Sequence, residues 1–214
     1  MKTRSKALLL TLCAVVLVIA TVFGTMAYLT STDKVENTFT VGSVNIKLDE
    51  AKANPDGSLV ANADRVKANS YKLLPGHTYN KDPMVTVLKG SEPSYVKMTV
   101  TFSKANELDA IFAPDGANLT SIFNGYDATN WIGKGNTKDA TADTRTYEFW
   151  YKETVGAPTA DVALDALFDS ITVPGSITNE QLATIEGMTI TVNAYAIQAD
   201  GFADADAAWE AFAN

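Results

Sequence analysis

The sequence predicts an all-β protein, a jelly-roll-like antiparallel two-sheet sandwich with a few short peripheral helices, preceded by a hydrophobic signal helix. Several segments alternate apolar and polar residues, which places one face of a strand in a core and the other in water. Turn signals separate these segments, among them Asn-Pro-Asp-Gly at 54–57 and Pro-Gly at 174–175. The only cysteine, Cys13, lies in the first hydrophobic stretch, so the β domain must be stabilised by its own core.

The first 27 residues have the layout of a secretory signal peptide. Three basic residues precede an apolar run over residues 7–23. Thr25 and Ala27 supply small side chains at the −3 and −1 positions of a cleavage site before Tyr28. We therefore predict that residues 1–27 are removed. An uncleaved membrane anchor is the alternative, because a run of about 17 apolar residues is near the lower limit for a membrane span.

Strand patterns dominate the rest of the chain, and we predict a single β-sandwich domain over residues 40–214. The expected strands cover residues 44–48, 84–88, 95–102, 145–153, 167–173 and 188–194. Residues 118–146 are rich in Gly, Asn, Thr and Lys, and we predict long loops there. The side chains expected to anchor these loops to the core are Trp131, Ile132, Tyr147 and Trp150.

Three short helices are expected at the periphery. The segment 178–186 opens with the spacing of a capping box, and Gly187 would end it. Asp204 would cap a terminal helix that carries Trp209. Residues 104–112 are the third candidate.

The charge of the chain limits its partners. The formal net charge is −8, and removal of the signal peptide, which carries three basic residues and no acidic one, makes it −11. Such an acidic surface argues against nucleic acid and against anionic membranes as partners. We expect a secreted protein, at the extracellular matrix or cell surface, that meets a membrane only before cleavage.

Four features of the sequence together point to a known family. They are the cleavage site followed by a short polar stretch, the step Phe39-Thr-Val-Gly42, the motif Leu74-Pro-Gly76 ahead of Tyr95-Val-Lys-Met98, and the segment Ile190–Phe202 that runs into an Ala-rich end. In these features the chain resembles the TasA/camelysin family. Its members are secreted proteins of Gram-positive bacteria that a SipW-type signal peptidase processes. The match is best over residues 1–48, 73–100 and 165–212.

The resemblance implies a jelly-roll subunit that polymerises into extracellular fibres of a biofilm matrix. It implies as partners the protein itself, as a homopolymer, and accessory matrix or cell-wall proteins. In the family, the mature N-terminal segment of one subunit docks as a strand into the next. Here that N-terminal arm would be residues 28–39, and its apolar members, the candidate donor-strand residues, are Tyr28, Leu29, Val35 and Phe39.

Strand donation of this kind is β-augmentation, and because donor and acceptor surfaces differ, the contact propagates into a filament. Two alternatives remain open for the arm. It could pair within its own sheet as a first strand, or it could stay loose.

Enzyme chemistry has little support in the sequence, although some family members carry a metalloprotease label. His77 is the only histidine, and one histidine cannot supply a His-Glu-x-x-His zinc site. A serine triad would need the same His77, and no Gly-x-Ser-x-Gly elbow is present. We predict no catalytic, cofactor-binding or metal-binding residues.

Calcium is the one ion left open as a cofactor. Asp200, Asp204 and Asp206 cluster near the C-terminus, and 49–50 (Asp-Glu) lie near Asp56, but neither group matches an EF-hand loop.

The main alternative function is a monomeric adhesin or carbohydrate-binding module. Trp150 or Trp131 would be its sugar-binding platform. In the expected strand 145–153, Trp150 lies on the face opposite to Tyr147, Phe149 and Tyr151.

Overall fold

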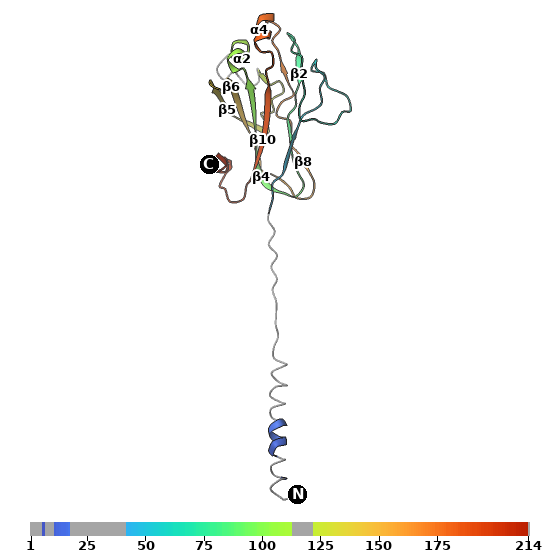
Figure 1. Cartoon of the computed structure of the whole chain (residues 1–214), viewed down its shortest axis with the longest axis vertical. Coiled ribbons are helices and arrows are strands. Elements are labelled where there is room, and N and C mark those ends of the chain that lie inside the picture. Colours follow the sequence, from blue (N-terminus) through green and yellow to red (C-terminus); the bar gives the residue numbers. More distant parts are fainter. Residues whose placement is uncertain (1–5, 7–10, 18–41, 113–121, 214) are drawn as a thin grey trace. The chain divides into compact units, whose positions relative to one another are not determined.

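The computed structural model describes residues 6, 11–17, 42–112 and 122–213 (Figure 1). The chain divides into two compact units, residues 1–41 and 42–214. In the first unit, residues 11–17 are helical. The predicted cleavage site at Thr25, Ala27 and Tyr28 and the arm 28–39 lie outside the described residues. Within the described ranges, no helix is both long and apolar enough to cross a membrane.

The second unit consists mostly of antiparallel strands. They are β1 (Ile46–Asp49), β2 (Thr78–Asn80), β3 (Met84–Val87), β4 (Ser91–Ser103), β5 (Trp131–Asp139), β6 (Thr144–Tyr151), β7 (Val155–Ala157), β8 (Val162–Ala163), β9 (Ser170–Thr172) and β10 (Ile190–Gln198). The largest sheet has the order β10–β4–β6–β5, and β7 also pairs with β4. Two smaller sheets have the orders β1–β3–β8 and β2–β9. This arrangement of sheets is consistent with a β-sandwich.

The long strand β4 organises the core. Val96, Met98 and Val100 are fully buried and alternate with partly exposed residues, as the period-two pattern predicts. Across the register, Val100 pairs with Tyr147 of β6 and Met98 with Phe149, so the same face of both strands is apolar. The core contains this face together with side chains of β2, β3 and β9 from the two smaller sheets.

The helices α2 (Ala105–Phe112), α4 (Asn179–Thr184) and α5 (Ala205–Ala213) lie outside the sheets. The predicted capping box is present at α4, where Thr178 and Gln181 exchange side-chain to backbone hydrogen bonds. At α5, the backbone N–H of Ala207 donates to the carboxylate of Asp204, as expected for a helix cap. The sequence signals for helix starts are therefore confirmed.

The prediction of loops over residues 118–146 was wrong in part. Residues 131–139 form β5, which pairs with β6 along its length. Most side chains of β5 are exposed, so backbone hydrogen bonds hold it and no apolar alternation marks it. Trp131 and Tyr147 anchor this region to the core as expected, whereas Ile132 is exposed.

The outer face of the large sheet is covered in part by α5. The ring of Trp209 lies 6.2 Å from that of Trp150, and the ammonium group of Lys97 lies 4.6 Å above the Trp209 ring. Trp209 is almost fully buried although it belongs to the last helix. The C-terminal helix is thus packed against the sheet through aromatic and cation–π contacts.

Candidate strand-acceptor site

The outer edge of β10 has unpaired backbone groups. β10 pairs with β4 on one side, and among the described residues no strand pairs with its other side, which we call the open edge. Residues 188–198 contain no Asp, Glu, Lys, Arg or Pro. A long, uncharged edge strand is a template for pairing with another chain.

The backbone groups at the open edge belong to the even-numbered residues of β10. The carbonyl of Thr189 accepts a hydrogen bond from Ser103, and the N–H of Ala199 donates to Pro93, so these odd-numbered residues face β4. Successive residues of a strand direct their backbone groups to opposite sides, and the β10–β4 register is unbroken. Val192 is therefore one of the residues whose N–H and C=O point away from the sheet.

The opposite edge of the same sheet, β5, is built differently. Its register is interrupted between Gly133 and Gly135, and Gly135 adopts a positive φ of 109°. Lys134 and Lys138 add two positive charges to the strand. Bulges and lysines are devices that discourage edge-to-edge pairing. The sheet therefore has one edge protected by a bulge and lysines, and one edge, that of β10, with which no described strand pairs.

A groove of about 780 Å³ opens beside the first residues of β10. Part of its wall is Tyr71 and Leu73 of the loop before β2, and another part is Met188 and Ile190. Phe102 is among the core residues that also line the groove. Because most of these side chains are apolar, the groove suits an apolar occupant.

The inner face of β10 is less covered than that of its neighbour. Val192 and Ala194 are only partly buried, whereas their partners Val100 and Met98 on β4 are fully buried. The core is thus incompletely closed along the open edge. An added strand with apolar side chains toward the core would complete this cover.

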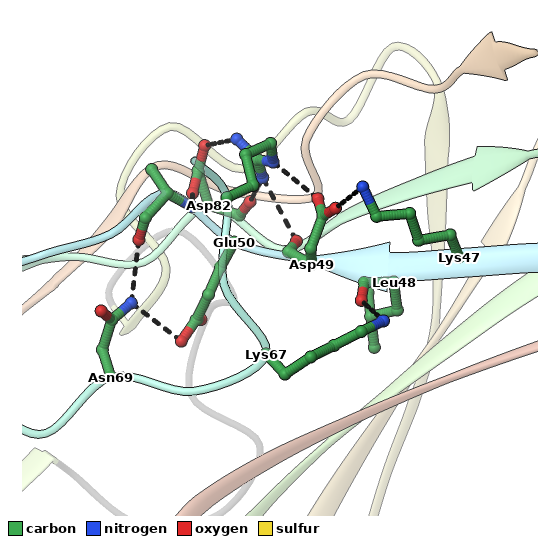
Figure 2. Close-up of polar contacts among 9 residues, drawn as sticks. Lys47, Leu48, Asp49, Glu50, Lys67, Asn69 and Asp82 are labelled. Atoms are coloured by element: carbon green, nitrogen blue, oxygen red, sulfur yellow. Dashed lines mark hydrogen bonds and ion pairs between the residues drawn. The ribbon is translucent and has the colours of Figure 1, made fainter. Parts of the chain in front are cut away.

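A network of charges fixes the loop that forms one groove wall (Figure 2). Arg65 donates to Asp49 at 2.6 Å and to Asp82 at 2.8 Å, and Lys47 contacts the second oxygen of Asp49 at 2.6 Å. Burial raises the pKa of Asp49, but the hydrogen bonds and charges of Lys47 and Arg65 together outweigh burial and leave it lowered. Lys67 donates to the carbonyl of Leu48. The loop is therefore held against the end of β1.

The candidate ligands weighed in the sequence lie in separate parts of the β domain. His77 is exposed and directly precedes β2. Asp204 caps α5, and Asp206 lies 3.4 Å from Lys134. Across the described part of the chain, no three His, Cys, Asp or Glu side chains gather in the way metal ligands do.

The two tryptophans weighed as sugar platforms differ in position. Trp131 is fully buried, and its indole N–H donates to the carbonyl of Asp165 at 3.0 Å, so the expectation of an exposed platform was wrong for this residue. Trp150 lies on the outer face, opposite to Phe149, as predicted. The ammonium group of Lys134 lies 3.8 Å above its ring and occupies one face that a sugar would need.

The candidate donor-strand residues Tyr28, Leu29, Val35 and Phe39 lie outside the described residues. Sequence reasoning missed the open edge of β10, although the absence of charge over residues 188–198 was a usable signal. It also missed the groove, because its walls come from segments far apart in the chain. Comparison of the chain with protein-family models, with curated proteins and with solved structures found no match.

Proposed function

We propose that this protein is a secreted structural subunit of extracellular matrix fibres, with a jelly-roll-like domain that accepts the N-terminal strand of the next subunit. The observation that carries the proposal is the open, uncharged edge of β10 beside an apolar groove. Residues 28–39 are the donor in this proposal. Their apolar members would fill the groove while their backbone pairs with β10.

The direction of assembly follows from the two ends of β4. Residue 42, where the second unit begins, is next to Ser43, which bridges to Ser91 at the start of β4. The groove is lined by Ile190, which pairs with Phe102 near the other end of β4. Residue 42 therefore lies at the end of the β domain opposite to the groove, and in the proposed head-to-tail arrangement the segment that precedes it would reach the groove of a neighbour.

This arrangement sets the orientation of the donated strand. β4 has 13 residues, which corresponds to about 40 Å, and residues 28–39 would extend over a similar length. With the last residues of the arm near the groove mouth, its first residues lie furthest along β10. The donated strand then runs antiparallel to β10, which is the more stable way to extend an antiparallel sheet.

The experiment that tests this function compares two purified forms by negative-stain electron microscopy. One form spans residues 28–214 and the other begins at Thr40. We expect filaments from the first and monomers from the second. Circular dichroism must show the same β content in both, so that loss of filaments reports loss of the arm and not of the fold.

Two other outcomes would change the conclusion. Filaments from both forms would place the contact between subunits elsewhere while keeping the structural role. Monomers from both forms, together with no binding of a synthetic peptide of residues 28–39 to the folded arm-deleted subunit, would reject strand donation. In that case the binding-module function, with Trp150 on the outer face, becomes the better explanation.

A further inference from the structure

Two side chains near the groove, those of Lys81 and Asn69, meet at the buried carboxylate of Glu50. Glu50 directly follows β1 and is 5% exposed, and Lys81 directly follows β2 and is 8% exposed. The Nζ atom of Lys81 lies 2.5 Å from Oε2 of Glu50. The Nδ2 atom of Asn69 lies 3.0 Å from Oε1 of the same carboxylate (Figure 2). An amine and a primary amide are therefore both bound to one acid.

The amide of Asn69 is held in a fixed orientation. Its Nδ2 also donates to the carbonyl of Ala51 at 2.8 Å, and its Oδ1 accepts a hydrogen bond from the backbone N–H of Ala53 at 2.9 Å. Both neighbours of Nδ2 are acceptors and the neighbour of Oδ1 is a donor, so the partners define which atom is nitrogen. The Ala53 N–H lies where it would stabilise negative charge that develops on Oδ1.

We propose that Lys81 and Asn69 become joined by an intramolecular isopeptide bond, with Glu50 as the group that moves the protons. The carboxylate of Glu50 accepts a proton from the ammonium group of Lys81. The neutral Nζ attacks Cγ of Asn69, and the resulting oxyanion on Oδ1 is bound by the N–H of Ala53. Glu50 delivers the proton to Nδ2 as the Cγ–Nδ2 bond breaks.

The step balances without any co-reactant. One C–N bond forms and one breaks, and nothing is oxidised or reduced. The two protons that Nζ loses leave with Nδ2 as ammonium, and Glu50 ends as the carboxylate it was at the start. The product is lighter than the unmodified chain by one ammonia.

The surroundings keep water away from the reacting groups. Lys81 and Glu50 are both buried, so their contact lies in a low-dielectric environment, where polar interactions are stronger than in water. Tyr71 packs nearby, and its pKa is raised, first by burial and then by the negative charge of Glu50. Nζ of Lys81 and Nδ2 of Asn69 contact the two oxygens of the Glu50 carboxylate. Rotation about the last bonds of the lysine side chain is therefore the movement that brings Nζ to Cγ of Asn69.

The cross-link would act as a covalent staple in a chain without disulfides. The sequence has one cysteine, Cys13, which lies in the predicted signal peptide. Asn69 and Lys81 both line the groove, and the bond would join the loop wall to the end of β2. It would therefore fix the wall of the groove, and it does not depend on whether strands are donated there.

The test is the intact mass of the purified full chain under denaturing conditions. We expect a mass lower than the sequence mass by one ammonia, and a branched tryptic peptide that contains both Asn69 and Lys81. Lys81→Arg, Asn69→Ala and Glu50→Gln should each restore the full mass. Lys67→Arg changes a neighbouring lysine of the same loop and should retain the loss.

A wild-type protein that is folded by circular dichroism and has the full sequence mass would overturn the proposal, and the cluster would then be an ordinary buried ion pair. Ammonia loss that persists in Lys81→Arg would also overturn it, because the modification would then lie elsewhere. Asn69→Asp offers a further check. The same attack on a carboxylic acid releases water, so its mass should fall by one water.

Discussion

Arg145 of β6 binds both carboxylate oxygens of Asp109 of α2, with N–O distances of 2.8 and 2.7 Å from one guanidinium nitrogen. Lys138 of β5 contacts the same carboxylate at 2.8 Å. Arg145 is only 8% exposed because it lies on the inner face of the sheet, paired with Phe102. One carboxylate of a short helix thus neutralises a buried guanidinium at the end of the core.

The Asp109→Ala substitution should destabilise the domain strongly. It removes the carboxylate that Arg145 binds with two guanidinium nitrogens, and breaking such a buried ion pair costs about 3–5 kcal/mol of the free energy of unfolding. Lys138→Ala is the matched control, because it removes the more exposed partner of the same carboxylate and should cost no more than about 1 kcal/mol. Urea unfolding followed by circular dichroism measures both. Equal losses from the two variants would contradict this account of the pair.

The Ala194→Pro substitution should prevent filament growth while the monomer remains folded. Ala194 directs its N–H to the open edge, so proline removes a donor that β4 does not use. Ala194→Gly is the control at the same position, since it weakens the strand but keeps the N–H. Electron microscopy should show filaments for the glycine variant and none for the proline variant. Filaments from both would mean that the open edge of β10 does not carry the contact.

Gly57 and Gly90 form a matched pair for testing backbone strain and space separately. Their φ angles are 89° and 87°, but a Cβ on Gly57 would lie 2.6 Å from the carbonyl oxygen of Thr78, whereas one on Gly90 would meet nothing within 4 Å. Gly90→Ala should cost about 1–2 kcal/mol from the left-handed backbone alone. Gly57→Ala adds overpacking and should cost about 3 kcal/mol or more. Similar midpoints of thermal unfolding for the two variants would show that the close contact at Gly57 adds no cost beyond the left-handed backbone.

Acid should weaken the domain through its paired carboxylates. The folded-state pKa values of Asp49 and Asp109 are lowered from 3.8, because hydrogen bonds and nearby positive charges outweigh the opposing effect of burial. A lowered folded pKa contributes stability that is fully present above the unfolded value and is lost as pH falls through the folded pKa. Urea midpoints should therefore be flat near neutral pH and fall below about pH 4.

The Asp49→Asn variant provides the comparison for this pH dependence. It should be less stable than the wild type at pH 7 and should lose less stability between pH 5 and pH 3. The reason is that one of the groups that must be protonated is already neutral. A parallel loss in both proteins would show that Asp49 does not take part.

The alternation of apolar and polar residues predicted the main strands of the sheets, because a strand with one face in the core and one in water must have this pattern. The predicted strand 95–102 lies within β4, and the segment 188–194 overlaps β10. β5 escaped detection because all but a few of its side chains are exposed, so its hydrogen bonds to β6 leave no apolar alternation in the sequence. The shortest strands, such as β8, are defined by pairing with a neighbour, which local sequence does not encode.

The candidate sites were less predictable because they depend on contacts between distant segments. Glu50 was weighed with Asp49 as a calcium ligand, whereas its carboxylate meets Lys81 and Asn69. Glu50 and Lys81 are 31 residues apart in the sequence, so an analysis of local motifs cannot detect their contact. The edge of β10 could have been suspected from its lack of charge, but its position at the end of the sheet order is a property of topology.

The difference between the two edges of the large sheet determines how many neighbours a subunit can join through it. With β5 protected by its bulge and lysines, strand donation as proposed would give each molecule one receptive edge of this sheet and one N-terminal donor. A monomer with one donor and one acceptor has a functionality of two, so under this proposal it would polymerise into unbranched chains and would not gel by itself. Any network made from such chains would need a separate cross-linking component, or lateral contacts through another surface.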